Sequence, residues 1–269
     1  MIAERLNQFE MRGVRKVRFL ASPTSHHHSR DLRTRVLKEA EFREDFPNFV
    51  VLPFANRVDR PEFDRHAQRL TARLLLEAFR GDAPNNVVGI GKSGLELARA
   101  VNRELLAKGN TPVFVEAKNL VDLEEAQYPK DGFIFTAHSY SRQEPIKFHL
   151  PHLESGKTAL VIDDVLAKGG ISQEVLRQLL AMGVDVRGFG VYFSKLWEGG
   201  VQQIVNEFGI PVVAAIAIAG KDGDKITLVG EADSLVRYER ESTDKWWQPD
   251  VTPVRYPTTP LEDAPPRKS

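Results

Sequence analysis

Several features are scarce or missing in this sequence. It contains no cysteine, and only three methionines and three tryptophans among 269 residues. The lack of cysteine excludes disulfide bonds, thiol nucleophiles and zinc–thiolate sites, and it is consistent with a reducing compartment. The longest apolar run, Pro211 to Ala219, is too short to span a bilayer, and Met1 to Leu6 lack the apolar region of a signal peptide. We therefore expect a soluble, cytoplasmic protein without a membrane partner.

An excess of either charge is also missing. The 37 lysines and arginines balance 37 acidic residues, so no global field favours binding to nucleic acid. Residues 1–38 are locally basic, with nine lysines and arginines against three acids. Such a segment can contact nucleic acid or an acidic partner, but it is more often a solvated helix and strand. The three histidines at 26–28 are similarly expected to form a polar turn, because adjacent residues rarely converge on one metal ion.

The content that is present is typical of a globular α/β protein. Hydrophobic residues make up 42% of the chain and charged residues 28%. Apolar runs that suit buried strands alternate with amphipathic segments, which predicts a Rossmann-like parallel sheet with helices on both faces. Strands are expected near residues 48–54, 86–90, 111–116, 158–162, 185–194 and 212–219, with a hairpin over 132–150. Helices are expected from Asp59 to Phe79 and over residues 95–106, 171–182 and 200–208.

The most informative stretch runs from Thr158 to Ser172. Five residues that suit a buried strand precede the adjacent acids Asp163 and Asp164, and Gly169-Gly170 then opens a helix. Parallel sheets bind ligands beyond the carboxyl ends of their strands, and a glycine turn before a helix offers backbone N–H groups to a phosphate. The alternative is a strand end with two solvated acids and an ordinary turn. The stretch therefore favours a site with carboxylates for sugar hydroxyls and amides for a phosphate.

This stretch resembles the motif of type I phosphoribosyltransferases that binds phosphoribosyl pyrophosphate (PRPP). The resemblance implies that Asp163 and Asp164 hold the ribose hydroxyls and that the following turn holds the 5-phosphate. Lys168 and Ile171 replace threonines that many members carry, so the Lys168 ammonium and the Ser172 hydroxyl are expected to substitute for them. The implied ribose-phosphate site comprises Asp163, Asp164, Val165, Leu166, Ala167, Lys168, Gly169, Gly170, Ile171 and Ser172.

Two other segments resemble the parts of this family that bind pyrophosphate. Gly91, Lys92, Ser93 and Gly94 follow an apolar strand, as in the family's loop whose amides cradle pyrophosphate. A nucleotide-binding P-loop is excluded there, because its first glycine would fall at Asn86. Ser139 to Gln143 resembles the flexible hood of xanthine phosphoribosyltransferases, which implies that Arg142 brings a catalytic cation to the pyrophosphate. The alternatives are a close-packed turn and an exposed loop arginine.

The base would be recognised by two further residues. Phe54, Asn56 and Asp59 are similar to a loop of xanthine phosphoribosyltransferases whose asparagine contacts the purine, although this loop is one residue shorter. Lys195 follows Gly188 and Gly190 at the spacing of a family lysine that contacts the exocyclic oxygen of a 6-oxopurine. A lysine donates hydrogen bonds and cannot accept them, so it selects an oxo group over an amino group. The alternatives are a turn asparagine and a solvated lysine.

The resemblance implies a purine phosphoribosyltransferase of purine salvage. It would transfer ribose 5-phosphate from PRPP, bound with Mg²⁺, to xanthine, guanine or hypoxanthine, with Asp163, Asp164 and Arg142 as catalytic residues. A homodimer is expected, and no direct protein ligand to the metal. The alternatives are a PRPP-binding regulator without turnover, and a transferase for adenine or a pyrimidine, which Lys195 disfavours. We expect a basic extension at residues 1–30, a phosphoribosyltransferase domain at 31–230 with a hood near 46–58 and 132–150, and an irregular tail at 231–269.

Overall fold

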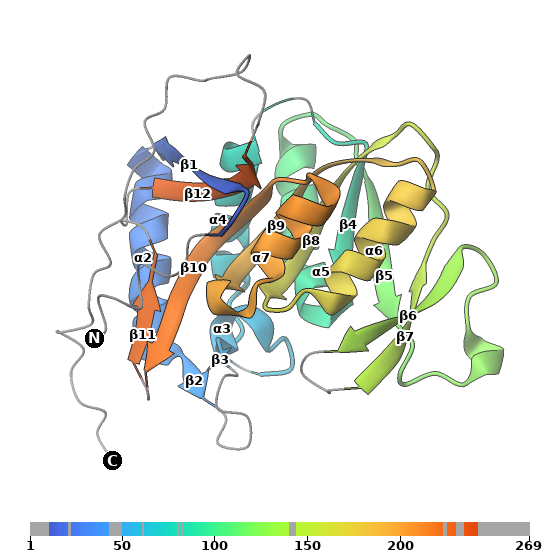
Figure 1. Cartoon of the computed structure of the whole chain (residues 1–269), viewed down its shortest axis with the longest axis horizontal. Coiled ribbons are helices and arrows are strands. Elements are labelled where there is room, and N and C mark those ends of the chain that lie inside the picture. Colours follow the sequence, from blue (N-terminus) through green and yellow to red (C-terminus); the bar gives the residue numbers. More distant parts are fainter. Residues whose placement is uncertain are drawn as a thin grey trace.

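A mixed β-sheet forms the centre of the molecule (Figure 1). The computed structural model describes residues 11–20, 23–42, 50–60, 62–79, 81, 83–139, 144–222, 225–229 and 234–241. In this part of the chain the sheet has ten strands in the order β1-β12-β10-β9-β8-β4-β5-β7-β6, with β11 paired to β10. Its strands are β1 (Val14–Leu20), β4 (Asn86–Ile90), β5 (Val113–Asn119), β6 (Phe133–Ser139), β7 (Glu144–Leu150), β8 (Thr158–Leu166), β9 (Asp185–Lys195), β10 (Val212–Asp222), β11 (Lys225–Leu228) and β12 (Ser234–Arg240).

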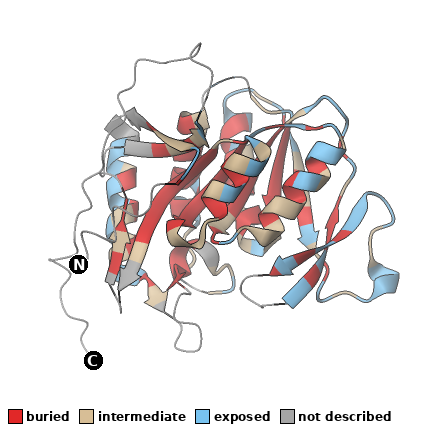
Figure 2. Ribbon diagram, viewed as in Figure 1, coloured by how far each residue is buried: buried red, intermediate tan, exposed pale blue. Residues whose placement is uncertain are grey.

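The middle of this sheet is parallel. Strands β5, β4, β8, β9 and β10 pair in parallel, which confirms the predicted α/β class. One face packs against α6 (Gly170–Ala181) and α7 (Gly200–Phe208), and the other against α2 (Pro23–Glu39), α4 (Arg65–Phe79) and α5 (Gly91–Ala107). Figure 2 shows the resulting buried strands between helices whose outer faces are exposed. Two covered faces explain why these strands read as continuous apolar runs.

Two strands to which the sequence analysis assigned no residue range, β1 near the start of the described chain and β12 near its end, extend the sheet. β1 pairs antiparallel with β12, and β12 also pairs with β10. The tail expected to be irregular from residue 231 therefore includes a strand, Ser234–Arg240, while residues 242–269 lie outside the described part. The interpretation of residues 26–28 as a turn is wrong, since they belong to α2. β12 has only Val236 and Tyr238 as buried apolar side chains, and the charged residues around them leave a weak apolar signal in the sequence.

The helix starts also differ from the prediction. α4 begins at Arg65, where Asp64 Oδ1 accepts hydrogen bonds from the backbone N–H groups of His66 (2.8 Å) and Ala67 (3.2 Å). Asp59, the predicted cap, instead pairs with Arg57 at 3.0 Å. α5 begins directly at Gly91, without the separate loop expected before Leu95. By contrast α6, α7 and the end of α6 at Gly183 (φ 77°) agree with the sequence pattern.

Two small elements lie on the side of the sheet to which the parallel strands point (Figure 1). The hairpin β6–β7 confirms the strands predicted over residues 132–150, and it joins the sheet through two residue pairs between β5 and β7. The pair β2 (Glu41–Phe42) and β3 (Val50–Val51) forms a separate sheet that leads into α3 (Pro53–Asn56). Two 3-10 turns, η1 (Glu125–Gln127) and η2 (Leu196–Glu198), complete the described elements.

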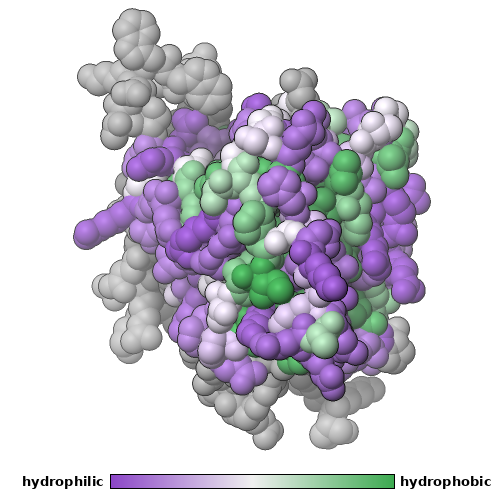
Figure 3. Space-filling model, turned by 90° about the vertical axis from the view of Figure 1, so that its right-hand side faces the viewer, coloured by the Kyte–Doolittle hydropathy of each residue, from purple (hydrophilic) through white to green (hydrophobic). Residues whose placement is uncertain are grey.

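The surface that carries the hairpin is mixed in character. Figure 3 shows hydrophobic side chains among hydrophilic ones on this side of the molecule. Phe133 and Ile134 at the start of the edge strand β6 are exposed by 40% and 45%, and the later residues of this strand alternate between buried and exposed. No helix in the described part of the chain has the length and apolar character needed to cross a membrane.

Candidate active site

A cleft of about 490 Å³ opens at the carboxyl ends of the parallel strands. β4, β5, β8 and β9 all reach it, so segments that are far apart in the sequence share its wall. Most of the site residues expected from the sequence line it, namely Gly91, Lys92, Ser93, Asp163, Asp164, Val165, Ala167, Gly169, Gly170, Ile171, Ser172 and Lys195. The structure therefore brings together the segments expected to bind pyrophosphate, ribose phosphate and base.

Asp163 and Asp164 occupy the last part of β8. Asp163 is buried, and its Oδ1 accepts a hydrogen bond from the Asp164 backbone N–H at 2.8 Å. Burial raises the pKa of Asp163 well above its usual range, and the charge of Asp164 raises this pKa further. Burial also raises the pKa of Asp164, while Lys195 acts in the opposite direction. Two acids held this way have an energetic cost in the free protein, and hydroxyl donors from a ligand would offset that cost.

The turn after β8 has the geometry of an anion site. Gly169 adopts a left-handed conformation (φ 74°, ψ 20°) and caps α6, which starts at Gly170. The positive end of the helix dipole and the amides of its first turn therefore face the cleft. Gly170 is required by close packing as well, since a Cβ there would lie 2.9 Å from the carbonyl oxygen of His138 on the hairpin.

Ser172 and Lys168, the residues expected to replace the missing threonines, differ from that expectation in their contacts and location. Ser172 is buried, and its hydroxyl donates to Asp163 Oδ2 at 3.1 Å. Ser172 thus orients a carboxylate. Lys168 is exposed and does not line the cleft, and Leu166 is fully buried in the core. Leu166 is the last residue of β8 and packs in the core beside this strand, whereas Lys168 lies beyond the strand in the turn.

The first turn of α5 faces the same cleft. Gly91 (φ 62°), Lys92 and Ser93 line it, and Lys92 Nζ lies 3.9 Å from Asp122 Oδ2 at an exposed position. Gly94 has a different function, because a Cβ there would lie 2.9 Å from the Asp163 backbone. The absence of a side chain lets α5 approach β8 closely. This contact brings the first turn of α5 next to the acids at the end of β8.

Lys195 ends β9 inside the cleft. Its side chain is only 1% exposed, and its positive charge acts on Asp164. Gly188 and Gly190, which precede it at the family's spacing, make room for α4, since a Cβ on Gly188 would meet Phe79 at 2.1 Å and one on Gly190 would meet Leu75 at 3.2 Å. The glycine pattern is therefore explained by helix–sheet packing, and the lysine is the member of the pattern that reaches the cleft.

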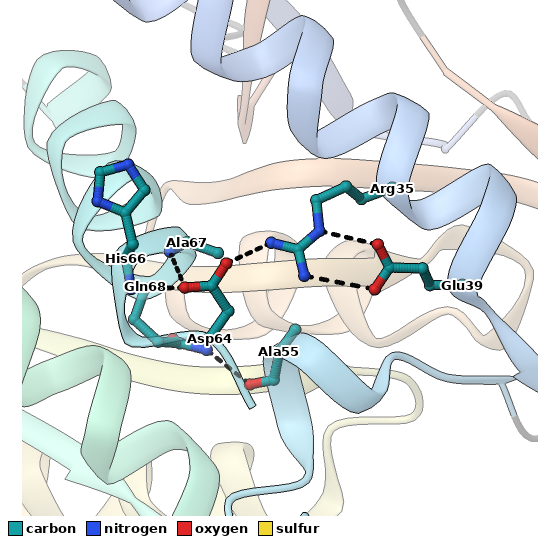
Figure 4. Close-up of polar contacts among 7 residues, drawn as sticks. All are labelled: Arg35, Glu39, Ala55, Asp64, His66, Ala67 and Gln68. Atoms are coloured by element: carbon teal, nitrogen blue, oxygen red, sulfur yellow. Dashed lines mark hydrogen bonds and ion pairs between the residues drawn. The ribbon is translucent and has the colours of Figure 1, made fainter. Parts of the chain in front are cut away.

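Contacts from α2 and α4 hold α3, the helix that ends at Asn56. Figure 4 shows those that involve Ala55, Asp64 and Arg35. Gln68 Nε2 donates to the Ala55 carbonyl at 2.8 Å, and the backbone N–H of Asp64 donates to the Phe54 carbonyl at 3.0 Å. Arg35 reaches from α2 to Asp64 at 2.5 Å and lies over the Phe54 ring at 4.1 Å. α3 is thereby fixed against α4 and β8, and Val50 just before it lines the cleft.

Two of the expected residues remain undescribed. The backbone of Asn56 ends α3, but its side chain lies outside the described part of the chain. Arg142 lies in the hairpin tip, residues 140–143, which is also outside it. Their expected roles stay predictions.

The cleft also contains polar residues that the sequence analysis did not identify. They lie on β5, on the segment that follows it and on β6, namely Glu116, Lys118, Asn119, Asp122 and His138. Their place in the sequence could have identified them, because they lie at or near strand ends and the carboxyl ends of all parallel strands meet at the same edge of the sheet. This rule pointed to Asp163 and Asp164 at the end of β8, and it holds equally for the polar residues at the end of β5.

The described residues contain no group of three or more side chains that could hold a metal ion. The carboxylates of Glu116, Asp122, Asp163 and Asp164 are nevertheless hard oxygen donors, which Mg²⁺ prefers. The cleft therefore fits a divalent cation that brings further ligands from a bound phosphate compound, and it does not form a closed metal site by itself.

Comparison with known proteins shows which family of sequences this chain resembles. A model of the phosphoribosyl transferase domain matches residues 56–200, more than half of the chain. A xanthine phosphoribosyltransferase of Bifidobacterium adolescentis is 28% identical over 158 residues, 58% of this chain and 72% of that protein. One of Listeria innocua is 29% identical over 161 residues, 59% of this chain and 79% of that protein.

Solved structures share the fold. An adenine phosphoribosyltransferase of Rhodothermus marinus superimposes with a TM-score of 0.53 at 20% identity, covering 71% of this chain and 98% of that one. The enzyme of Giardia lamblia, solved with 9-deazaadenine, gives 0.55 at 17% identity, covering 70% of this chain and 97% of that one. With the acidic strand end, the glycine turn and the matched domain on one cleft, this chain belongs to the type I phosphoribosyltransferase family of enzymes.

Proposed function

We propose that this enzyme transfers ribose 5-phosphate from PRPP to a 6-oxopurine, either xanthine, guanine or hypoxanthine. The products would be a nucleoside monophosphate and pyrophosphate, so the enzyme would act in purine salvage in the cytoplasm. The observation that carries the proposal is the shared cleft, in which Asp163 and Asp164 lie beside the glycine turn and a buried lysine. The curated relatives named xanthine phosphoribosyltransferase support the choice of base.

In the proposed reaction the bond from ribose C1′ to the pyrophosphate oxygen breaks, and a bond from C1′ to a purine nitrogen forms. The purine loses one proton, and pyrophosphate leaves with the bonding electron pair. Positive charge develops on the ribose ring as the leaving group departs. Asp163 and Asp164 would accept hydrogen bonds from the ribose hydroxyls and would favour the cationic ring, since fixed negative groups in a dry site act strongly on developing charge.

The opposite side of the cleft would manage the leaving group. Amides of the first turn of α5, from Gly91 to Gly94, together with Lys92 and Arg142, would bind the pyrophosphate. When bound with PRPP, Mg²⁺ would neutralise part of the pyrophosphate charge. The α6 turn would hold the 5-phosphate, so the two phosphate groups would be fixed on two helix N-termini with the reacting carbon between them.

The base would lie toward Lys195 and α3. An ammonium group donates hydrogen bonds only, so Lys195 would favour an oxygen at position 6 of the purine over the amino group of adenine. Asn56 would provide the second contact. We also propose that the protein is a homodimer, as the resemblance implies. A PRPP-binding regulator is the less favoured alternative.

Pyrophosphate release from Mg-PRPP with a panel of xanthine, guanine, hypoxanthine and adenine tests the proposal. Turnover with one or more of the three 6-oxopurines, and none with adenine, is the expected result. The Lys195→Ala variant should lose preference for an oxo group while retaining PRPP binding. If adenine is used best, the assignment of Lys195 is wrong, and if no base reacts while PRPP still binds, the protein is a regulator.

A further inference from the structure

Three successive carbonyl groups in the turn between β8 and α6, those of residues 167–169, accept hydrogen bonds from α6 and α7. Ala167 O accepts from the Gly200 backbone N–H at 2.9 Å, and Lys168 O accepts from Gln173 Nε2 at 2.9 Å. Gly169 O accepts from the Gln173 backbone N–H at 2.8 Å, as the first hydrogen bond of α6. Three successive carbonyls are therefore engaged by α6 and α7. This matters because a carbonyl oxygen directed into the turn would repel a phosphate, whereas N–H groups attract it.

Gly200 makes this arrangement possible at the start of α7. A Cβ on Gly200 would lie 2.2 Å from Ala167 O and 3.0 Å from the Lys168 carbonyl carbon. Any side chain would therefore push α7 away from the turn. Unlike Gly199 (φ 82°), Gly200 does not have a positive φ, so close approach rather than backbone conformation requires glycine here.

Gln173 carries the second connection. Its Nε2 donates both to Lys168 O at 2.9 Å and to Gln203 Oε1 of α7 at 2.7 Å. The amide group can make both bonds only if its nitrogen faces the turn, and Gln203 fixes that orientation by offering its oxygen. The side chain thus bridges the turn and α7.

We propose that Gln173 and Gly200 are positioning residues for the ribose 5-phosphate site, with Gln203 fixing the orientation of Gln173. They act through the backbone of residues 167–169, by holding the carbonyls outward so that the amides face the phosphate. This inference deepens the proposed function and rests on it. It also gives α7 a role in substrate binding, although none of the α7 side chains lines the cleft.

Two isosteric variants that add the same charge test the inference. Gln173→Glu replaces the donor to Lys168 O with an acceptor, whereas Gln203→Glu keeps an acceptor for Gln173 Nε2. Ribose 5-phosphate binding is measured by calorimetry on the full chain. We expect the dissociation constant to rise about tenfold for Gln173→Glu, the loss of one to two hydrogen bonds, and about twofold or less for Gln203→Glu. Gln202→Glu, on the same helix, controls for the added charge, and it gives up only a long hydrogen bond from Gln202 Nε2 to the Arg12 carbonyl at 3.3 Å.

The kinetic parameters provide a second measurement. Gln173→Glu should raise KM for PRPP and leave KM for the purine unchanged, a split that general destabilisation would not produce. Gly200→Ala should act in the same direction, and a thermal unfolding scan of each variant separates this effect from loss of fold. Equal effects of Gln173→Glu and Gln203→Glu on ribose 5-phosphate binding would overturn the inference. Failure of the unaltered protein to bind ribose 5-phosphate would overturn it together with the proposed function, whereas binding without turnover would overturn only the proposed reaction.

Discussion

Two pairs of carboxylates in this protein differ in what surrounds them. At the end of β8, Asp163 is buried and Asp164 beside it is half-buried, and loss of contact with water raises the pKa of both. Asp64 and Glu104, on the helix side, are partly buried as well, which by itself would raise the pKa. Arginines overcome this effect, so that Arg35 lowers the pKa of Asp64, and Arg73 with Arg69 lowers that of Glu104.

The difference separates acids that stabilise the fold from acids that are available to a ligand. Asp64 combines a helix cap with an ion pair, and Glu104 joins α4 to α5 through two arginines at 2.9 and 2.7 Å. At the end of β8, by contrast, Asp163 accepts hydrogen bonds from the Ser172 hydroxyl and the Asp164 backbone N–H, and its nearest charged neighbour is a second carboxylate, Asp164. We therefore expect the cleft acids to lower the stability of the free protein, in return for binding a substrate.

The largest expected effect is on PRPP binding by the double variant Asp163→Asn/Asp164→Asn. It removes both of the charged groups proposed to accept hydrogen bonds from the ribose hydroxyls, and hydrogen bonds to charged groups contribute about 1.5–3 kcal/mol each. We expect a loss of affinity of about a hundredfold or more, measured by calorimetry with Mg-PRPP, together with an unchanged or raised melting temperature. Unchanged affinity would show that the ribose lies elsewhere, and a lower melting temperature would contradict the comparison.

The second prediction concerns pH. Because the pKa values of Asp163 and Asp164 are raised in the folded protein, these acids take up protons at a pH above the ordinary carboxyl range of about 4. PRPP affinity should therefore fall as pH falls through these raised values, and the same protonation should add stability. The pKa values of Asp64 and Glu104 are lowered, so their contribution to stability is present above the ordinary range and is lost only below it.

Binding should therefore weaken on acidification before the fold does. Calorimetric titrations between pH 4 and pH 8, compared with thermal unfolding at the same pH values, measure the two curves. PRPP also titrates, so the protein's own contribution is the part of the pH dependence that disappears in Asp163→Asn/Asp164→Asn. The comparison fails if unfolding precedes the loss of affinity.

The third prediction is for Asp64→Ala, which should affect stability more than PRPP binding. It removes the cap of α4 and the partner of Arg35, and loss of a helix cap costs about 1 kcal/mol. We expect a lower melting temperature with PRPP affinity unchanged. KM for the purine should rise, because Asp64 anchors the α3 segment. Asp59→Ala, in the loop just before and paired only with Arg57 among its ion pairs in the described residues, is the matched control and should change little.

The smallest expected effect is that of Glu104→Gln. Its partners Arg69 and Arg73 are 59% and 40% exposed, so solvent and salt screen both pairs. We expect a loss of about 0.5 kcal/mol in unfolding free energy, which should shrink further at 1 M salt. Urea unfolding at low and high salt measures it, and a salt-independent loss would indicate packing rather than charge.

The sequence predicted the parallel core and much of the cleft. Alternating apolar and amphipathic segments located β4, β8, β9, α6 and α7, and the pair Asp163-Asp164 with its glycines located the wall of the cleft. The sequence missed β12, whose side chains alternate weakly, and it placed the cap of α4 five residues early at Asp59. Both errors have one physical cause, since local pattern does not reveal which partner a strand or a carboxylate meets.

The sequence by itself therefore determined the class of fold and the chemical groups of the site. Apolar periodicity and the order of acid, glycine and helix are local properties of a chain, and they can be read from it directly. Only the tertiary structure decided that the Ser172 hydroxyl donates to Asp163, that Gly94 lets α5 approach β8, and that Gly200 and Gln173 engage the carbonyls of the turn after β8. These are contacts between elements, and their distances are fixed by packing that no single segment encodes.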